Sequence, residues 1–281
     1  MPALPAVAEP TNYFSRFGAL AWRSLAQIVR APSHSRRAEA ARRSARHVVL
    51  LMAIIGVAIV VLMYVLDVRE ISLMPPRGTP GLWPVRILTD FGKDIYVLGA
   101  LGALLIAVVV VAPALRGIQR SLLLDLGTRL QFLFFAVLVS VLSGELIKWV
   151  VGRGRPFVGG QANAFNFSHF AATEAYSSFP SGHATTAFAL AFAVAAIWPR
   201  ARIAMIAYAL VIAATRLVLL AHLPSDVVAG ALVGITGAMV VRYWFAARRL
   251  GFAIHRDGTI VALTGPSSGR LKRVARGALA P

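Results

Sequence analysis

Residues 203–245 read IAMIAYALVIAATRLVLLAHLPSDVVAGALVGITGAMVVRYWF. Two apolar runs flank the short polar segment Ala-His-Leu-Pro-Ser-Asp at 221–226. Each run is close to the roughly 20 helical residues that cross a bilayer, so the stretch predicts two antiparallel membrane helices. Arg216, His222 and Asp226 lie around the polar segment. A membrane protein keeps ionisable groups in such places where a site requires them, so we look for chemistry here first.

Four further apolar runs precede this stretch. Together with its two halves they make six runs long enough to cross a bilayer: 48–66, 95–115, 130–147, 184–198, 203–220 and 227–245. Hydrophobic residues make up 58% of the 281 residues and charged residues only 14%, with a mean hydropathy of +0.72, values that exclude an ordinary soluble domain. We therefore predict an all-α integral membrane protein, a bundle of six transmembrane helices. Because the first run begins only at residue 48, we expect it to serve as the insertion signal.

The arginines predict how the chain is oriented. The formal net charge is +18 and the sequence pI is about 11.7. The basic residues gather before the first run, after the second, between the fourth and fifth, and after the sixth, instead of along one face of a folded domain. Nucleic acid is therefore not an expected partner. Positive residues near span ends are retained in the cytoplasm, so we predict cytoplasmic termini and three loops on the outer face, at 67–94, 148–183 and 221–226.

This pattern divides the chain into three regions. Residues 1–47 form a basic cytoplasmic region, 48–246 the six-helix membrane domain, and 247–281 a basic cytoplasmic tail. At 100° per residue, Arg16 and Arg23 fall on one stripe of a predicted amphipathic helix at 13–30. That helix either lies in the headgroup region or packs on the bundle.

Two weaker signals lie in the C-terminal tail. Asp257-Gly258 between 252–256 and 259–263 is typical of a hairpin. Beyond residue 265, the Gly, Ser, Pro and Arg content predicts a disordered segment. The chain has no cysteine and so no disulfide or thiolate nucleophile.

Cations gather in the predicted outer loop at 148–183. Lys148 ends the third run, and Arg153 and Arg155 follow in the sequence Gly-Arg-Gly-Arg-Pro. Solvated juxtamembrane charges would fit this pattern poorly, since cations are disfavoured in short outer loops. An anionic ligand would explain them. Glu145, one turn before Lys148, is expected to pair with it.

Two histidines stand at predicted helix starts. The turn Pro180-Ser181-Gly182-His183 precedes the fourth run, where backbone N–H groups and the helix dipole suit phosphate oxygens. Taken alone, His183 is more typical of a capping or interfacial residue. His222 precedes Asp226 by four residues, which places both on one helix face, so the Asp can fix the His tautomer and leave the other nitrogen free to attack. Asp226 can equally cap the helix.

The ordered combination of these motifs resembles the type 2 phosphatidic acid phosphatase family, membrane lipid phosphate phosphatases related to acid phosphatases and vanadium haloperoxidases. The resemblance covers about 48–245. It implies phosphate binding by the following residues: Lys148, Arg155, Ser181, Gly182 and Arg216. It further implies that His183 protonates the leaving group, that His222 is the nucleophile that forms a phosphohistidine, and that Asp226 orients His222.

One position departs from the family pattern, because Thr215 stands where a serine usually precedes the arginine of the third motif. The hydroxyl is retained, so we expect activity, although the added methyl could crowd the pocket. Arg153 is an extra cation of open role. His169 is expected to be a loop residue.

These features predict a metal-independent phosphatase with no cofactor. Fixed cations and backbone N–H groups can stabilise a transferring phosphoryl group, and no carboxylate or histidine cluster has metal-ligand spacing. The family and orientation imply a multi-pass protein of the bacterial inner membrane, with membrane lipids as partners and its site facing the periplasm. The substrate stays open among undecaprenyl diphosphate, phosphatidylglycerophosphate, phosphatidic acid and lipid A phosphate. Alternatives are a lipid phosphotransferase, a non-catalytic lipid-binding or transport protein and, less well supported, a haloperoxidase.

Overall fold

The computed structural model describes residues 12–156, 158–159 and 163–263. Its α-helices are α1 (Tyr13–Val29), α2 (Arg37–Val65), α3 (Asp67–Leu73), α4 (Trp83–Asp90), α5 (Asp94–Val111), α6 (Gly117–Val151), α7 (Gly182–Ile197), α8 (Arg202–Val218) and α9 (Pro224–Ala247). Short 3-10 turns are η1 (Pro80–Leu82), η2 (Ala112–Ala114), η3 (Glu174–Tyr176) and η4 (Pro199–Ala201). Two strands, β1 (Phe252–Ile254) and β2 (Ile260–Ala262), complete the described chain. The protein is therefore mainly helical, as predicted.

Five helical segments of the described chain are long and apolar enough to cross a membrane: Arg37–Val65, Pro80–Ala114, Gly117–Val151, Pro199–Val218 and Pro224–Ala247. The fourth predicted span corresponds to α7, which has only 16 residues. At 1.5 Å per residue this helix is roughly 24 Å long, short of the roughly 30 Å hydrocarbon layer. Helix α7 packs against α6, α8 and α9, which shield it on several sides.

Small residues allow α7 and α9 to pack closely. A Cβ atom added at Gly230 would lie 2.5 Å from the Ser181 carbonyl oxygen, and one at Gly234 would lie 2.4 Å from that of Thr185. Neither contact is sterically possible, so both positions require glycine. The four-residue spacing of these glycines, typical of close helix packing in membranes, has that role here.

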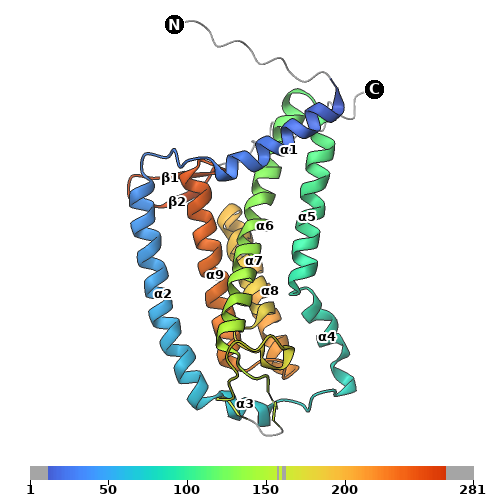
Figure 1. Cartoon of the computed structure of the whole chain (residues 1–281), viewed down its shortest axis with the longest axis vertical. Coiled ribbons are helices and arrows are strands. Elements are labelled where there is room, and N and C mark those ends of the chain that lie inside the picture. Colours follow the sequence, from blue (N-terminus) through green and yellow to red (C-terminus); the bar gives the residue numbers. More distant parts are fainter. Residues whose placement is uncertain (1–11, 157, 160–162, 264–281) are drawn as a thin grey trace, which may run out of the picture.

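The loop expected at 67–94 is largely helical. It contains α3, η1 and α4, which lie at one end of the bundle, whereas α1 and the β1–β2 hairpin lie at the other end (Figure 1). The connection between α6 and α7 reaches the same end as α3 and α4. Every segment with candidate chemistry therefore gathers at one end of the molecule.

Both terminal signals are confirmed where the structure describes them. Helix α1 forms at Tyr13–Val29, close to the predicted 13–30. The hairpin forms with Phe252 opposite Ala262, and Gly258 adopts a φ of +79° in its turn. This small antiparallel sheet adds two short strands to an otherwise helical chain, because a residue with positive φ favours a tight turn over a helix. The predicted disordered segment beyond residue 265 lies outside the described residues.

Candidate active site

A cavity of about 430 Å³ opens at the end of the bundle that carries α4 and the α6–α7 connection. Its lining includes six of the eight predicted site residues: Lys148, Arg155, Gly182, His183, Arg216 and His222. Those six come from α6, the following loop, α7, α8 and the α8–α9 connection. Ser181 and Asp226 do not line the cavity, and both are fully buried beside it. Folding thus brings these six motif residues, which lie up to 74 positions apart in the sequence, into one concave site.

The end of α6 positions Lys148 and Arg155, the first two motif cations. The helix ends at Gly152, whose φ of +57° is left-handed, and a Cβ atom there would lie 1.7 Å from the Ser168 carbonyl oxygen. Only glycine lets the chain turn back across the mouth of the bundle at this point. Lys148 forms an ion pair with Glu145, as predicted. Arg155 lies near Glu174, with 3.4 Å between Nη2 and Oε1.

The second motif begins α7. Ser181 is its N-cap residue, and its N–H donates to the Asp226 carbonyl oxygen over 2.9 Å. A Cβ atom at Gly182 would lie 3.1 Å from Lys148 Nζ, so glycine lets the ammonium group approach the helix start closely. The buried Nε2 of His183 has no hydrogen-bond partner within the described ranges. A ligand in the cavity is a suitable partner for that nitrogen, since buried polar atoms are generally paired.

His222 is oriented by a backbone carbonyl. Its Nδ1 lies 2.9 Å from the Ser178 oxygen, and because a carbonyl only accepts, Nδ1 carries the proton. The lone pair is then on Nε2, the nitrogen suited to attack. Burial, followed by the positive charges of Arg216 and Arg155, holds the pKa of His222 well below its usual value. The imidazole is therefore neutral at pH 7.

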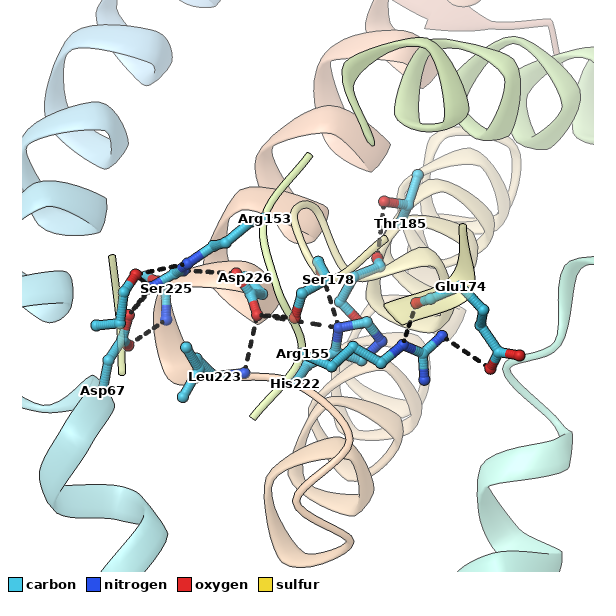
Figure 2. Close-up of polar contacts among 12 residues, drawn as sticks. Asp67, Arg153, Arg155, Glu174, Ser178, Thr185, His222, Leu223, Ser225 and Asp226 are labelled. Carbon is cyan, nitrogen blue, oxygen red and sulfur yellow. Dashed lines mark hydrogen bonds and ion pairs between the residues drawn. The ribbon is translucent and has the colours of Figure 1, made fainter. Parts of the chain in front are cut away.

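Asp226 acts on His222 indirectly, which corrects the direct orientation that we expected. Its Oδ2 lies 4.0 Å from His222 Nδ1, too far for a hydrogen bond. The same oxygen accepts from Ser178 Oγ over 2.6 Å and from the Leu223 N–H over 2.9 Å (Figure 2). Asp226 is committed to these donors because it occupies the third position of α9, where a carboxylate caps the free N–H groups of the helix start. The N-cap residue of α9 is therefore Leu223 and not Asp226, which caps the helix start from its third position and holds the residue that orients His222.

Arg153, whose role the sequence left open, is a buried structural cation and does not line the cavity. The side chain is 0% exposed, and its two terminal nitrogens contact carboxylates from separate parts of the chain. Nη1 donates to Asp226 over 2.6 Å and Nη2 to Asp67 over 2.8 Å (Figure 2). Ser225 Oγ and the Ala164 carbonyl oxygen accept further bonds. Burying an arginine requires such complete pairing, and here it ties α3 to the start of α9.

Arg216 is held by α4, an element that the motifs did not include. Its Nη1 donates to Thr89 Oγ1 over 2.8 Å, and Thr215 Oγ1 lies 2.9 Å from the same oxygen. Thr215 does not line the cavity, so its additional methyl does not crowd the pocket. Four more charged residues from α4 and the start of α5 line the cavity: Arg86, Asp90, Lys93 and Asp94.

Sequence reasoning missed Asp67, Thr89 and Ser178. A single polar residue at a span end or in a loop has no spacing signal that links it to motifs far along the chain. The one available hint was Asp67, an acid directly after the first apolar run. His169, by contrast, is exposed and lies outside the cavity lining, in agreement with its prediction as a loop residue. Within the described ranges, no group of three or more His, Cys, Asp or Glu side chains is placed to hold a metal ion.

Part of the chain is similar to a known protein family and to curated proteins. Residues 129–250 match the model of the PAP2 superfamily. A lipid A 1-phosphatase of Rhizobium johnstonii is 40% identical over 127 residues, which is 45% of this chain and 52% of the relative. A lipid A 1-phosphatase of Rhizobium etli is 39% identical over 127 residues, covering 45% of this chain and 55% of the relative.

The chain spans about half the length of the curated relatives that it matches. No solved structure matches the chain significantly. The matched region contains every motif residue from Lys148 to Asp226, whereas α3 and α4 lie before it. Residues 129–250 are therefore similar to the PAP2 superfamily, and this match supports the predicted resemblance to the type 2 phosphatidic acid phosphatase family.

Proposed function

We propose that the protein is a membrane lipid phosphate phosphatase that works through a phosphohistidine at His222. One observation carries this proposal: the three motif cations and both motif histidines line a single cavity of about 430 Å³. Lys148, Arg155 and Arg216 would bind the phosphate oxygens. The transferring phosphoryl group spreads negative charge over those oxygens, so fixed cations stabilise its transition state.

The proposed reaction has two steps. The first starts with His183 in its protonated form, which the negative charge of the bound phosphate favours. The lone pair on His222 Nε2 forms a bond to phosphorus, the bond from phosphorus to the lipid oxygen breaks, and His183 gives that oxygen a proton. In the second, His183 accepts a proton from water, the water oxygen bonds to phosphorus, and the phosphorus–nitrogen bond breaks. Inorganic phosphate leaves and both histidines regain their starting forms. The Ser178 carbonyl, held by Asp226, keeps the attacking nitrogen aimed throughout.

Among the candidate substrates, we propose a lipid A phosphate. The support is that both relatives are named lipid A 1-phosphatase. Their alignments with this chain cover 127 residues, which is 45% of the chain. We also propose that the protein lies in a bacterial inner membrane with six crossings, cytoplasmic termini and the cavity facing the periplasm. The apolar helices and the placement of arginines support this orientation.

The first test is phosphate release by detergent-purified protein from lipid A, undecaprenyl diphosphate, phosphatidylglycerophosphate and phosphatidic acid, with EDTA present throughout. We expect release from lipid A, inhibition by vanadate, and a fall of about 10³-fold or more for His222→Ala. His169→Ala is the matched control, since His169 is exposed outside the cavity, and it should retain wild-type activity.

Other outcomes would separate the alternatives. No release from any lipid by folded wild-type protein would overturn the phosphatase proposal. If a labelled phosphoryl group were transferred to an acceptor lipid instead of being released as free phosphate, the protein would be a phosphotransferase. Full activity of His222→Ala would eliminate the phosphohistidine while leaving hydrolysis intact.

A further inference from the structure

A second cavity, of about 570 Å³, is lined by residues of α1, α5 and α6. Helix α1 lies at the opposite end of the molecule from α3 and α4 (Figure 1). Helix α1 is attached to the bundle near both of its ends. The Tyr13 hydroxyl donates to the Val110 carbonyl oxygen over 2.8 Å, and Trp244 Nε1 donates to that of Ile28 over 2.9 Å. Between these attachments, α1 spans a space bounded by α5 and α6.

The wall of this cavity is mainly apolar and opens to the surroundings of the bundle. Phe17 and Ala21 line it from α1, and further apolar side chains of α5 and α6 complete it. Three lining residues are also well exposed on the outside of the molecule: Leu25 at 60%, Ile106 at 67% and Leu124 at 37%. Since α5 and α6 belong to membrane-spanning segments, hydrocarbon has access to this opening.

The polar side chains inside the cavity bind mostly to one another. Gln131 is only 8% exposed and is hydrogen-bonded to Gln27 over 3.0 Å and to Ser24. These groups are therefore already satisfied and offer little to a small polar ligand.

The charged side chains of the lining are of one sign. Arg23 and Arg120 line the cavity, and no aspartate or glutamate in the described chain does. Neither arginine forms an ion pair with a described residue, and the buried Nε of Arg120 has no hydrogen-bond partner there. Arg120 lies in the first turn of α6, whose N-cap residue provides no side-chain cap, so the helix dipole adds positive potential. Apolar walls with two uncompensated cations complement a lipid chain attached to an anionic headgroup.

We propose that this cavity binds an anionic glycerophospholipid, with one acyl chain beneath α1 and the headgroup phosphate against Arg23 and Arg120. The volume lies within the roughly 300–1,000 Å³ of typical ligand pockets. Anionic lipid attracts each nearby arginine by about 1 kcal/mol, so two arginines favour it over a zwitterionic lipid by about 30-fold. This site is separate from catalysis, and its occupation does not depend on the proposed enzymatic activity.

The test uses delipidated full-length protein and native mass spectrometry. The protein is titrated with phosphatidylglycerol or with phosphatidylcholine of the same acyl chains, and the most tightly held lipid per chain is counted. We expect one phosphatidylglycerol bound about 30-fold more tightly than phosphatidylcholine. The double substitution Arg23→Gln with Arg120→Gln should abolish that preference, and Ala21→Trp should displace both lipids by filling the cavity from α1.

Arg46→Gln is the matched control, because Arg46 is an exposed arginine of α2 at the same end that does not line the cavity. It should bind phosphatidylglycerol as the wild type does, and circular dichroism should show that every variant keeps its helical content. Equal binding of the two lipids by wild type would overturn the headgroup assignment. Unchanged binding in the Ala21→Trp variant would overturn the cavity as the site. Phosphate release, measured separately, reports on the active site alone.

Discussion

At the scale of single residues, Arg153 and Arg155 stand two positions apart and have different surroundings. Arg153 is fully buried between Asp67 and Asp226, whereas Arg155 lines the cavity beside the exposed Glu174. Arg153→Met leaves two buried carboxylates unpaired and should lower the free energy of unfolding by about 3–5 kcal/mol. Arg155→Met loses a weak ion pair and one hydrogen bond, both to the exposed Glu174, so the free energy of unfolding should change by less than about 1 kcal/mol, while kcat/KM falls about 10²-fold.

Denaturant unfolding in detergent and phosphate release, measured on the same preparations, check both expectations. If Arg155→Met proved as unstable as Arg153→Met, the division between a structural and a phosphate-binding arginine would be wrong.

The protonation of His222 is a second residue-scale prediction. Burial and the charges of Arg216 and Arg155 lower its pKa, so the folded protein should keep a neutral His222 at pH values well below 6.5. Removing a positive charge makes protonation easier, so Arg155→Gln should raise this pKa. Histidine resonances followed by nuclear magnetic resonance from pH 4 to 8, and assigned with His222→Ala, measure it directly. Titration of His222 near 6.5 in folded wild type would contradict the account.

At the scale of elements, α4 supplies a partner that the matched PAP2 region does not contain. Thr89 accepts the hydrogen bond from Arg216 and lies 40 residues before that region begins. Thr89→Val keeps the side-chain shape but removes the acceptor from a charged donor, a bond of about 1.5–3 kcal/mol, so kcat/KM should fall about tenfold or more. Thr89→Ser retains the hydroxyl and should restore most of the activity. A fully active valine variant would show that α4 does not position Arg216.

At the scale of the whole molecule, the arrangement of helices makes the orientation testable. The chain has no cysteine, so labelling of a single introduced cysteine shows on which side of the membrane that one position lies. Ser168→Cys places it at the end with the candidate active site, and Ser35→Cys at the end with α1; both positions are exposed. A membrane-impermeant maleimide applied to intact spheroplasts should label Ser168→Cys, and should label Ser35→Cys only after permeabilisation. The reverse pattern would invert the proposed orientation.

The helices could largely be predicted from the sequence, because a membrane span is a local property of about 20 consecutive residues. All six apolar runs correspond to helices, although α7 is shorter than a typical span. The helices within residues 67–94 were harder to predict. Helices α3 and α4 gain their stability from packing at the end of the bundle, which local composition does not reveal.

The membrane setting, the helical runs and the motif residues could be predicted because each depends on residue type and short-range spacing. The partners of those residues depend instead on the tertiary fold. It gave His222 the Ser178 carbonyl in place of Asp226, buried Arg153 between two carboxylates, and brought Thr89 to Arg216. Those contacts join residues 44 to 127 positions apart in the sequence. Hydrogen bonds and ion pairs act over about 3 Å, so they depend on how the helices pack and leave no periodic signal along the chain.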